Sequence, residues 1–245
     1  MRHIPLGRDS TVLELGCGDG FQLELLRKQF ARVFAVDPED VPQARSGFAR
    51  CVAEALPFRN QSFDFVISSN VTEHLTDRER AMAEIRRVLR PGGYVAHIVP
   101  TRTWKAMSLF FNPIGYPIRV VEKWRARRGR RGGLDGNEIA QFRLVSSPGI
   151  LQVLRRWLWP PVHGTFSSHL DEYRSYGRSE WSRTFAHKDL SFVAEVPLIF
   201  YTPFSLCRFR KVPARLWAAS QGLTSTRAYI FQLTPMVHCK TIIAR

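Results

Sequence analysis

The fold of this chain is limited above all by a short apolar segment that ends at three closely spaced glycines. The apolar segment covers residues 11–15, and from residue 21 to 30 apolar residues recur at helical spacing. The glycines between them stand at Gly16, Gly18 and Gly20. This pattern predicts a strand, a tight turn and a helix. A helix placed there can carry the chain back to start a second strand parallel to the first.

The same alternation of short apolar runs and helical periods continues to Pro100. Further strands are expected at residues 32–36, 48–52, 63–68 and 94–99. Asp77 can cap a helix that runs to Leu89 and is ended by the Pro-Gly-Gly segment at 91–93. Apolar strands joined by helical crossovers predict an α/β fold, Rossmann-like and doubly wound, with a mostly parallel sheet covered on both faces.

The regularity fails after Pro100 and returns only late in the chain. One or two helices are expected at residues 103–131, a glycine loop at 132–136 and an aromatic amphipathic helix at 150–159. They are followed by an expected strand at 192–200, a helix at 205–219 and a strand at 228–233.

The glycine turn predicts a ligand site. Glycines at the carboxyl end of a first strand allow positive φ and let a ligand approach the backbone without meeting a Cβ atom. A dinucleotide fingerprint would place a further glycine at Phe21, three residues beyond Gly18. Its absence favours a ligand without pyrophosphate. The plainer alternative is a turn that merely starts the helix.

Asp37 ends the second expected strand. A carboxylate there can accept hydrogen bonds from both hydroxyls of a ribose. The alternative is an aspartate that only caps the turn before Pro38. Taken with the glycine turn, Asp37 favours a ribonucleoside without phosphate, bound where the strand order reverses, and S-adenosylmethionine fits that description.

Five motifs follow one another in residues 11–99. They are Val12–Gly20, Val36-Asp37, Ala53–Phe58 with Ser62–Val66, Ser69–Leu75 and Arg87–Gly93. In this order they resemble the class I S-adenosylmethionine-dependent methyltransferases of the broad ubiquinone-biosynthesis-like group. The resemblance implies S-adenosyl-L-methionine as cofactor.

The resemblance also assigns residues to the methionine side of that cofactor. It implies that Gly16 and Gly18 pass the methionine moiety. Glu14 would lie near its ammonium group, and Asn70 would line the same side.

The adenosine side shows one departure from the family pattern. By resemblance, Asp37 holds the ribose hydroxyls and the backbone N–H of Ala53 meets the adenine edge. Relatives usually carry an Asp before the Ala-Glu pair to accept the adenine amino proton, whereas this chain has Val52. We expect either that Glu54 takes over this contact or that packing and backbone contacts hold the adenine.

Two histidines are candidates for the catalytic base. A hydroxyl that accepts a methyl group in an in-line displacement must lose its proton. His74 follows the fourth strand with Glu73 beside it, and His163 lies in the irregular insertion close in sequence to residues 171–173. The Glu73-His74 pair could instead simply bind backbone groups. His97, within the fifth strand, is expected in the core or in a pocket lining.

The segment around Glu73 also bears on metal binding. Some related ubiquinone O-methyltransferases carry a Glu-x-x-Glu-His metal cluster there. Here the first position is Asn70, which leaves Glu73 and His74 as a poor two-ligand site. We therefore expect no obligatory metal ion; loss of activity with EDTA, restored by magnesium, would contradict this.

Segments after the fifth strand suggest the acceptor. They are residues 98–104, 159–164, 180–185 and 229–235. Less specifically than the cofactor motifs, they resemble a branch of these enzymes often associated with bacterial surface-polysaccharide biosynthesis, and they favour a hydroxyl of a sugar or lipid-linked saccharide. We divide the chain into a cofactor-binding half (1–100), a basic, aromatic lid (101–190) and C-terminal strands with a helix that complete the sheet (191–245).

The net charge of +15 lies entirely in the second part of the chain. Residues 1–100 hold 13 basic and 13 acidic side chains, and residues 101–245 hold 23 basic and 8 acidic ones. In the lid, aromatic residues such as Trp104 alternate with basic ones such as Lys105, a mixture suited to an anionic membrane surface. The alternative is an aromatic lid packed on the sheet, with a solvated rim of arginines.

Cysteines and apolar runs bear on the compartment. The four cysteines, at Cys17, Cys51, Cys207 and Cys239, include no C-x-x-C pair, which argues against a disulfide framework or a zinc site built on them. The first ten residues lack the apolar core of a signal peptide, and no apolar run reaches the roughly 20 residues of a membrane span. We expect a cytoplasmic protein that could associate peripherally with the inner face of the membrane.

Three other functions stay open. The lid would also suit a quinone-like or other aromatic small molecule, methylated on oxygen or carbon. The basic insertion could bind RNA, but residues 68–71 lack the Asn/Asp-Pro-Pro-aromatic pattern of many nucleic-acid methyltransferases, so nucleic acid is the less favoured partner. Finally, the chain could be a non-catalytic cofactor-binding or scaffold module.

Overall fold

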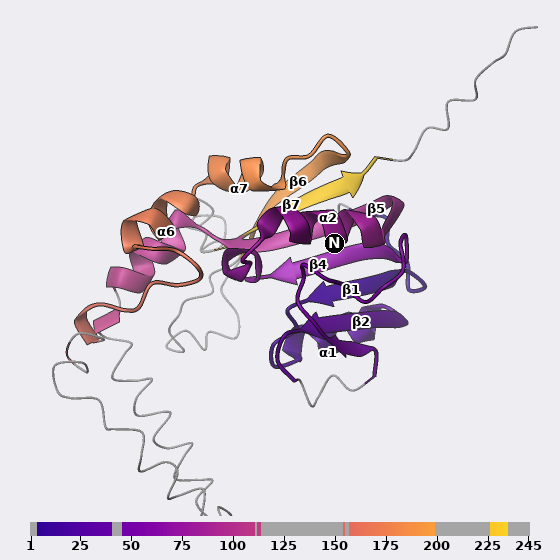
Figure 1. Ribbon diagram of the computed structural model, residues 1–245, viewed down its shortest axis with the longest axis horizontal. Coiled ribbons are helices and arrows are strands. Elements are labelled where there is room, and N and C mark those ends of the chain that lie inside the picture. The colour runs from indigo at the N-terminus through magenta and orange to yellow at the C-terminus, as the bar shows by residue number, and fades with distance from the viewer. Residues whose placement is uncertain are drawn as a thin grey trace, which may run out of the picture.

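A computed structural model of the 245-residue chain describes residues 4–40, 46–110, 112–113, 154, 157–198 and 226–234. These residues build one seven-stranded sheet with helices packed against it, drawn in Figure 1. The predicted α/β, Rossmann-like, mostly parallel architecture is confirmed.

The order of the strands in the sheet is β3-β2-β1-β4-β5-β7-β6. Their bounds are β1 (Thr11–Leu15), β2 (Arg32–Asp37), β3 (Phe48–Arg50), β4 (Phe63–Ser69), β5 (Leu89–Pro100), β6 (Leu190–Leu198) and β7 (Thr226–Leu233). The first five strands pair in parallel, and β7 runs antiparallel to both β5 and β6. The chain goes from β1 to β2 on one side and later to β4 on the other. The carboxyl ends of β1 and β4 therefore flank a topological switch point, where sheets of this kind bind ligands.

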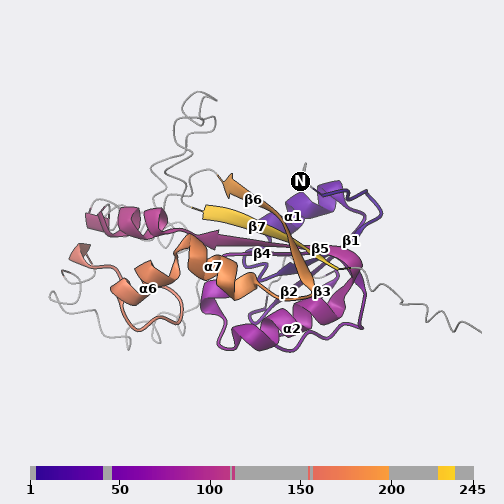
Figure 2. The ribbon, with the colours of Figure 1, turned by 90° about the horizontal axis from the view of Figure 1, so that it is seen from above.

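Helices cover both faces of the sheet. Figure 2 shows α1 (Phe21–Gln29) on one side, and α2 (Arg78–Val88) and α7 (Arg178–Phe185) on the other. Successive side chains of β1 point to opposite faces. Val12 therefore packs in the apolar cluster that includes the buried residues of α1, whereas Leu13 packs in the cluster that includes those of α2 and α7.

The start of α2 matches the prediction, but the segment after its last residue differs from it. The Asp77 side chain accepts a hydrogen bond from the backbone N–H of Arg80 at 2.9 Å, and the helix ends at Val88. The Pro-Gly-Gly segment at 91–93 then lies within β5, which begins at Leu89 rather than at the expected residue 94. An irregularity in the pairing of β4 with β5 accommodates the segment, since Phe63 faces Leu89 and Phe65 already faces Tyr94.

Two short helices lie in the region where the sequence shows no regular pattern. They are α6 (His169–Ser175) and α7. Ser168 caps α6, and its hydroxyl accepts the N–H of Asp171 at 3.1 Å. With seven and eight residues, they span too few turns for a helical period to stand out in the sequence. Their register is set instead by packing: Trp181 and Phe185 of α7 stack in the core beside Tyr176.

The described part of the insertion extends beyond the sheet. Strand β5 ends at Pro100 and β6 begins at Leu190, and in Figure 1 α6 lies past the end of the sheet toward which the arrows of β1 and β4 point. Residues 102–110 are helical. The loop expected at 132–136, the helix at 205–219 and most of 103–131 and 150–159 lie outside the described residues. Within the described ranges, no helix is both long and apolar enough to cross a bilayer.

Candidate active site

The glycine turn after β1 has the backbone that only glycine adopts readily. Gly16, Gly18 and Gly20 have φ of 68°, 52° and 79°. A Cβ atom on Gly16 would lie 2.3 Å from Cγ2 of Val71, whereas one on Gly18 would meet no atom of the described residues within 4 Å. Gly16 is therefore a packing requirement, and Gly18 leaves open space beside the backbone.

Asp37 joins this turn to the end of β2. Its Oδ2 accepts the N–H of Gly18 at 2.9 Å, and its Oδ1 accepts the N–H of Glu39 at 3.0 Å. Asp37 thus caps the turn, and each of its carboxylate oxygens still has a lone pair for another donor. The two predicted roles, capping the turn and binding ribose hydroxyls, are therefore compatible. Asp37 lies where a ribose diol would be expected.

Glu14 is a buried carboxyl group on β1 beside the turn. Its side chain is almost inaccessible, and among the described residues its Oε2 has no hydrogen-bond partner. The pKa of Glu14 is raised to about 8, mainly by burial; Arg27 opposes this rise, whereas the neighbouring Asp19 and Asp37 contribute to it. A buried acceptor of this kind suits a cationic ligand group, such as the ammonium group that the resemblance places there.

The expected adenine side is built from the segment after β3. Ala53 is buried, and Val52 is 48% exposed. Oε1 of Glu54 lies 3.4 Å from both the Thr76 hydroxyl and the Asp77 N–H, at the start of α2. These contacts are long and involve one carboxylate oxygen, so both expectations for the adenine, a contact from Glu54 or packing and backbone contacts, stay predictions.

Asn70 directly follows β4 and has a backbone conformation unusual for a residue other than glycine. Its φ is 54°, and its N–H donates to the carbonyl of Ile98 at 2.9 Å. Asn tolerates this left-handed region better than most residues. The bend turns the chain so that Val71 packs against Gly16, and a short helix, η2 (Thr72–His74), comes next. The predicted methionine-side residues therefore meet at the switch point.

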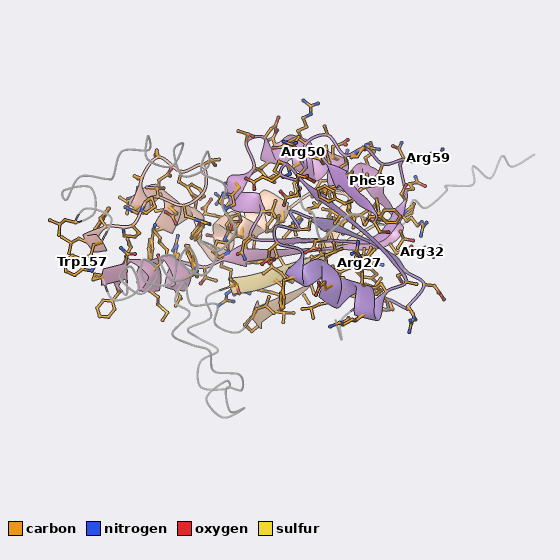
Figure 3. All side chains as sticks on the ribbon, turned by 90° about the horizontal axis from the view of Figure 1, so that it is seen from below. Arg27, Arg32, Arg50, Phe58, Arg59 and Trp157 are labelled. Carbon is orange, nitrogen blue, oxygen red and sulfur yellow. The ribbon has the colours of Figure 1, made fainter. Side chains whose placement is uncertain are left out.

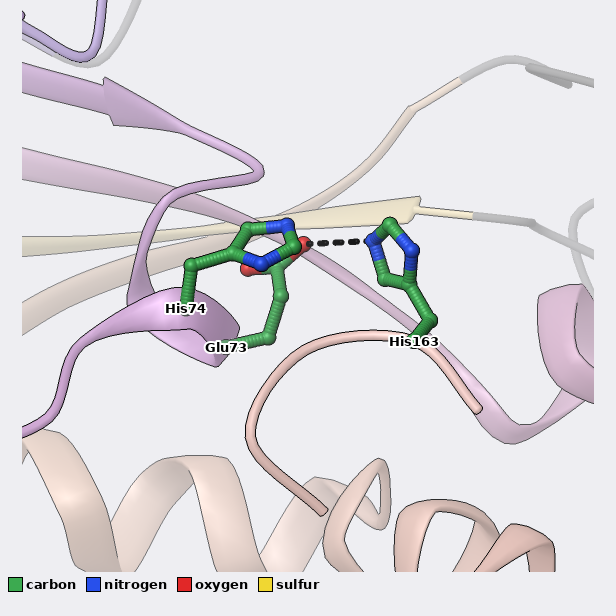
Figure 4. Close-up of side chains that lie close together, drawn as sticks. All are labelled: Glu73, His74 and His163. Carbon is green, nitrogen blue, oxygen red and sulfur yellow. Dashed lines mark ion pairs between the residues drawn. The ribbon is translucent and has the colours of Figure 1, made fainter. Parts of the chain in front are cut away.

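The structure brings the two candidate bases together on Glu73 (Figure 4). The rings of His74 and His163 lie 4.6 Å apart, and Nε2 of His163 is 3.9 Å from Oε1 of Glu73. Glu73 is fully buried, and neither of its carboxylate oxygens has a hydrogen-bond partner among the described residues. Burial raises the pKa of Glu73 to about 7. Burial, and then the nearby His74, lowers the pKa of His163.

A second buried cluster holds the loop that carries His163. Glu172 of α6 accepts the backbone N–H of His163 at 3.1 Å and forms a buried ion pair with Lys105. The Lys105 ammonium also lies 2.7 Å from Nδ1 of His169. On the other side, the loop approaches η2 so closely that a Cβ atom on Gly164 would lie 2.5 Å from the Glu73 carbonyl oxygen. These contacts fix His163 over Glu73.

The other side chains considered as bases or helpers lie elsewhere. His97 is buried, its Nδ1 is 2.8 Å from the Ser68 hydroxyl, and its ring stacks on Phe185. Burial lowers the pKa of His97 to about 3, so it is a neutral core residue, as expected. Of the residues near His163 in sequence, Glu172 contacts it, whereas Asp171 caps the preceding turn through Ser167.

One expectation about the lid surface is wrong. The sequence pattern puts Lys105 among the basic residues that face an anionic membrane, but its side chain is 2% exposed and paired with Glu172. Burial lowers its pKa, while Glu172 opposes that effect. Trp104, expected on the same surface, instead packs beside Tyr176 and His163. The helix at residues 102–110 therefore turns these side chains inward.

Known proteins resemble this chain mainly in its first half. A family described as a methyltransferase domain matches residues 13–97, about a third of the chain. The ubiquinone biosynthesis O-methyltransferase of Rhizobium etli is 32% identical over 109 residues, which are 40% of this chain and 44% of that protein. An uncharacterised methyltransferase of Mycolicibacterium gilvum is 31% identical over 139 residues, 51% of this chain and 53% of the relative.

The match covers the glycine turn, Asp37 and the segment that ends at His97. Residues 13–97 match a methyltransferase domain, in agreement with the class I S-adenosylmethionine-dependent methyltransferases that the motifs resemble. The cofactor is S-adenosylmethionine, as the motifs predicted. The chain spans only about two fifths to one half of the length of these curated relatives.

Solved structures extend the likeness of fold beyond the methyltransferase motifs. An S-adenosylmethionine-dependent methyltransferase from Mesorhizobium loti is 12% identical with a TM-score of 0.53, covering 94% of each chain. The [4+2]-cyclase SpnF, also 12% identical with a TM-score of 0.53, covers 96% of this chain and 78% of its own. Because one of these two is called a cyclase, the fold alone does not fix the reaction.

The residues of the methyltransferase domain fit its cofactor. Gly18 leaves open space at the turn, Asp37 retains acceptor capacity, and the buried Glu14 has one carboxyl oxygen that no described residue hydrogen-bonds. These features match a ligand that carries a ribose and an ammonium group.

Some contributors to the site were not found from the sequence. Val71, which packs on Gly16, lies within the Ser69–Leu75 motif, but the motif predicts no role for it; Lys105, which anchors Glu172, lies in no motif. For Gly164, the signal in the sequence is a glycine directly after a candidate base, a residue that permits the close approach of the loop to Glu73.

Proposed function

We propose that the protein transfers a methyl group from S-adenosylmethionine to a hydroxyl group of a sugar or lipid-linked saccharide. The observation that carries this proposal is the meeting of Glu73, His74 and His163 beside the cofactor turn. Val71 links the two sites, because its side chain packs on Gly16 while its carbonyl accepts the N–H of His74 at 2.8 Å.

The cluster can help to remove a proton from the acceptor. A hydroxyl group needs this help, whereas an acceptor that is already nucleophilic does not. When bound, the cofactor supplies an electrophilic methyl group: the C–S bond breaks as the O–C bond forms, sulfur keeps the electron pair, and the hydroxyl proton must leave. As free imidazoles, His74 or His163 would accept this proton. As ligands of a cation, they would hold the ion that acidifies the hydroxyl. One similar relative is itself named as an O-methyltransferase.

A lipid-linked acceptor is supported by the outer end of the lid. Phe110, Leu158 and Trp159 are 76%, 58% and 56% exposed. Trp157 connects the segment near Phe110 with the segment that holds Leu158 and Trp159, because its indole N–H donates to the carbonyl of Pro113 at 2.6 Å. Figure 3 shows Trp157 at the end of the molecule opposite to Arg32 and Arg59. Exposed apolar groups gathered at one end suit contact with a lipid surface.

Labelling identifies the acceptor directly. The purified full chain is incubated with methyl-labelled cofactor and fractionated cell extract, and label is expected in glycolipid or saccharide. Asp37→Ala should abolish labelling. His163→Ala should reduce it by roughly 100-fold or more, the range for losing a proton-transfer group. His187→Ala is the matched control, because His187 pairs with Asp189 away from the cluster.

Each alternative has its own outcome. Label in a quinone-like compound would replace the saccharide with an aromatic acceptor, which the position of Trp104 beside His163 also favours. Label in RNA would overturn the proposed acceptor. Cofactor binding without any labelled product would indicate a binding or scaffold module.

A further inference from the structure

We propose that Glu73, His74 and His163 bind one divalent transition-metal ion. One ligand atom from each residue lies within 4.8 Å of those from the other two. Ligand atoms about 2.0–2.1 Å from a tetrahedral Zn²⁺ are roughly 3.3 Å apart, so small ring rotations would bring all three onto one ion.

The buried carboxylate is the observation that points to a ligand. Glu73 is fully buried, and among the described residues neither of its oxygens accepts a hydrogen bond. The nearby nitrogen of His163, at 3.9 Å, is beyond hydrogen-bond distance. A buried carboxylate without donors is strongly unfavourable unless a cation or a proton compensates it. A metal ion between Glu73 and the imidazoles would supply that compensation.

The chemistry of the ligands selects the kind of ion. Two imidazole nitrogens and one carboxylate oxygen suit Zn²⁺ and similar transition metals, whereas Mg²⁺ and Ca²⁺ prefer sets made of oxygen. Three protein ligands also leave a coordination position open, as in catalytic zinc sites. His74 is exposed and His163 half-buried, so the open position would face the accessible side of the cluster.

The lid supplies His163 as a third metal ligand, in addition to the two ligands, Glu73 and His74, that the sequence predicts. The expectation of no obligatory metal considered only Glu73 and His74, with Asn70 in place of a third ligand. His163 comes from a distant segment, and the contact of the Thr165 N–H with the Glu73 carbonyl, at 3.3 Å, brings that segment to the site. Metal binding would therefore join the lid to the sheet.

The use of the ion, but not its binding, rests on the proposed function. An acceptor hydroxyl at the open position would be acidified by the ion, and its proton would pass to water on the accessible side. In this arrangement His74 and His163 act as ligands and not as bases.

Zinc titration tests the site without cofactor or acceptor. The full chain is stripped with a chelator and titrated with Zn²⁺ by calorimetry, and one ion should bind per chain. Glu73→Gln and His163→Ala should each weaken binding by about 100-fold or more, because loss of even an outer-shell partner costs 10- to 100-fold. His187→Ala should bind as the wild type does.

The variants are chosen so that folding does not confuse the result. Glu73→Gln keeps the shape of a buried side chain and removes its charge, and His163→Ala truncates a side chain that is 40% exposed. Circular dichroism should show both folded. Unchanged Zn²⁺ affinity in both variants, Mg²⁺ binding as tight as Zn²⁺ binding, or Zn²⁺ binding abolished by alkylating the cysteines would each overturn the proposed site.

Zinc titration and methyl labelling test the metal site and the methyl transfer separately. Zn²⁺ bound at the cluster with no labelled product would support the site and overturn methyl transfer. Full labelling by the metal-free chain would support methyl transfer and overturn the role of the ion in it.

Discussion

Gly16 and Gly18 lie two residues apart, but a side chain would meet a steric clash only at Gly16. Gly16→Ala would force a methyl group against Val71 in addition to the cost of positive φ, roughly 1–2 kcal/mol. Gly18→Ala should incur only the φ cost, because no atom in the described part of the chain lies within 4 Å of its Cβ position. We expect Gly16→Ala to lower the thermal midpoint more than Gly18→Ala does.

The double variant Gly16→Ala/Val71→Ala provides the control for that comparison. It removes the Cγ2 atom that the new methyl group would meet at 2.3 Å, and should recover part of the lost stability. Equal thermal midpoints for the two single glycine variants would contradict the steric explanation.

Glu14 should make the stability of the cofactor-free protein depend on pH. Its pKa is about 8 in the fold, mainly through burial, against 4.5 as the ordinary value. The unfolded chain therefore releases this proton first, and the folded state loses stability as pH rises from about 4.5 to 8. The full effect is on the order of 4 kcal/mol.

Glu14→Gln removes this titration while keeping the shape of the side chain. The variant and the wild type should have similar thermal midpoints near pH 4.5, and the variant should be the more stable at about pH 8 to 9. Calorimetry should also show weaker cofactor binding, since the carboxylate is lost. A midpoint difference that does not change with pH would contradict the assignment.

At the scale of elements, the pair of Lys105 and Glu172 ties the helix at residues 102–110 to α6. Lys105→Met would leave Glu172 buried without its partner, which typically costs about 3–5 kcal/mol. Thermal unfolding should show this loss. Lys105→Met/Glu172→Gln removes both charges and should be more stable than Lys105→Met alone.

The same pair also positions the lid. Because Glu172 accepts the backbone N–H of His163, the Lys105→Met variant should weaken Zn²⁺ binding although Lys105 is not a ligand. Unchanged affinity in a folded variant would show that the loop holds its position without the ion pair.

At the scale of the whole molecule, cofactor turn and lid meet at one end of the sheet, and the exposed apolar groups lie on the lid beyond it. The chain should therefore sediment with vesicles of anionic phospholipid at low salt and be released at high salt. Trp159→Ser should weaken sedimentation. Phe192→Ser is the matched control, because Phe192 is 58% exposed on β6, against 56% for Trp159. Quantitative recovery in the supernatant at low salt would contradict membrane association.

Local patterns predicted most of the elements in the first hundred residues, although not the start of β5. Short apolar runs and helical spacings predicted β1, α1, β2 and β4, and the positive φ of Gly16 follows from the kind of turn that joins a strand to a helix. These features depend on neighbours in sequence, so the sequence contains the information that fixes them. The short helices α6 and α7 depend on packing against the sheet, and no local pattern revealed them.

By itself the sequence determined the parallel sheet, the glycine turn, the acidic residue at the end of β2 and, through these motifs, the cofactor. It named His74 and His163 separately, but only the tertiary structure decided that both lie against Glu73 and that Lys105 is buried under α6. The reason is physical: a turn or a helix period is encoded over a few neighbouring residues. A contact between segments about ninety residues apart forms only when the whole chain packs.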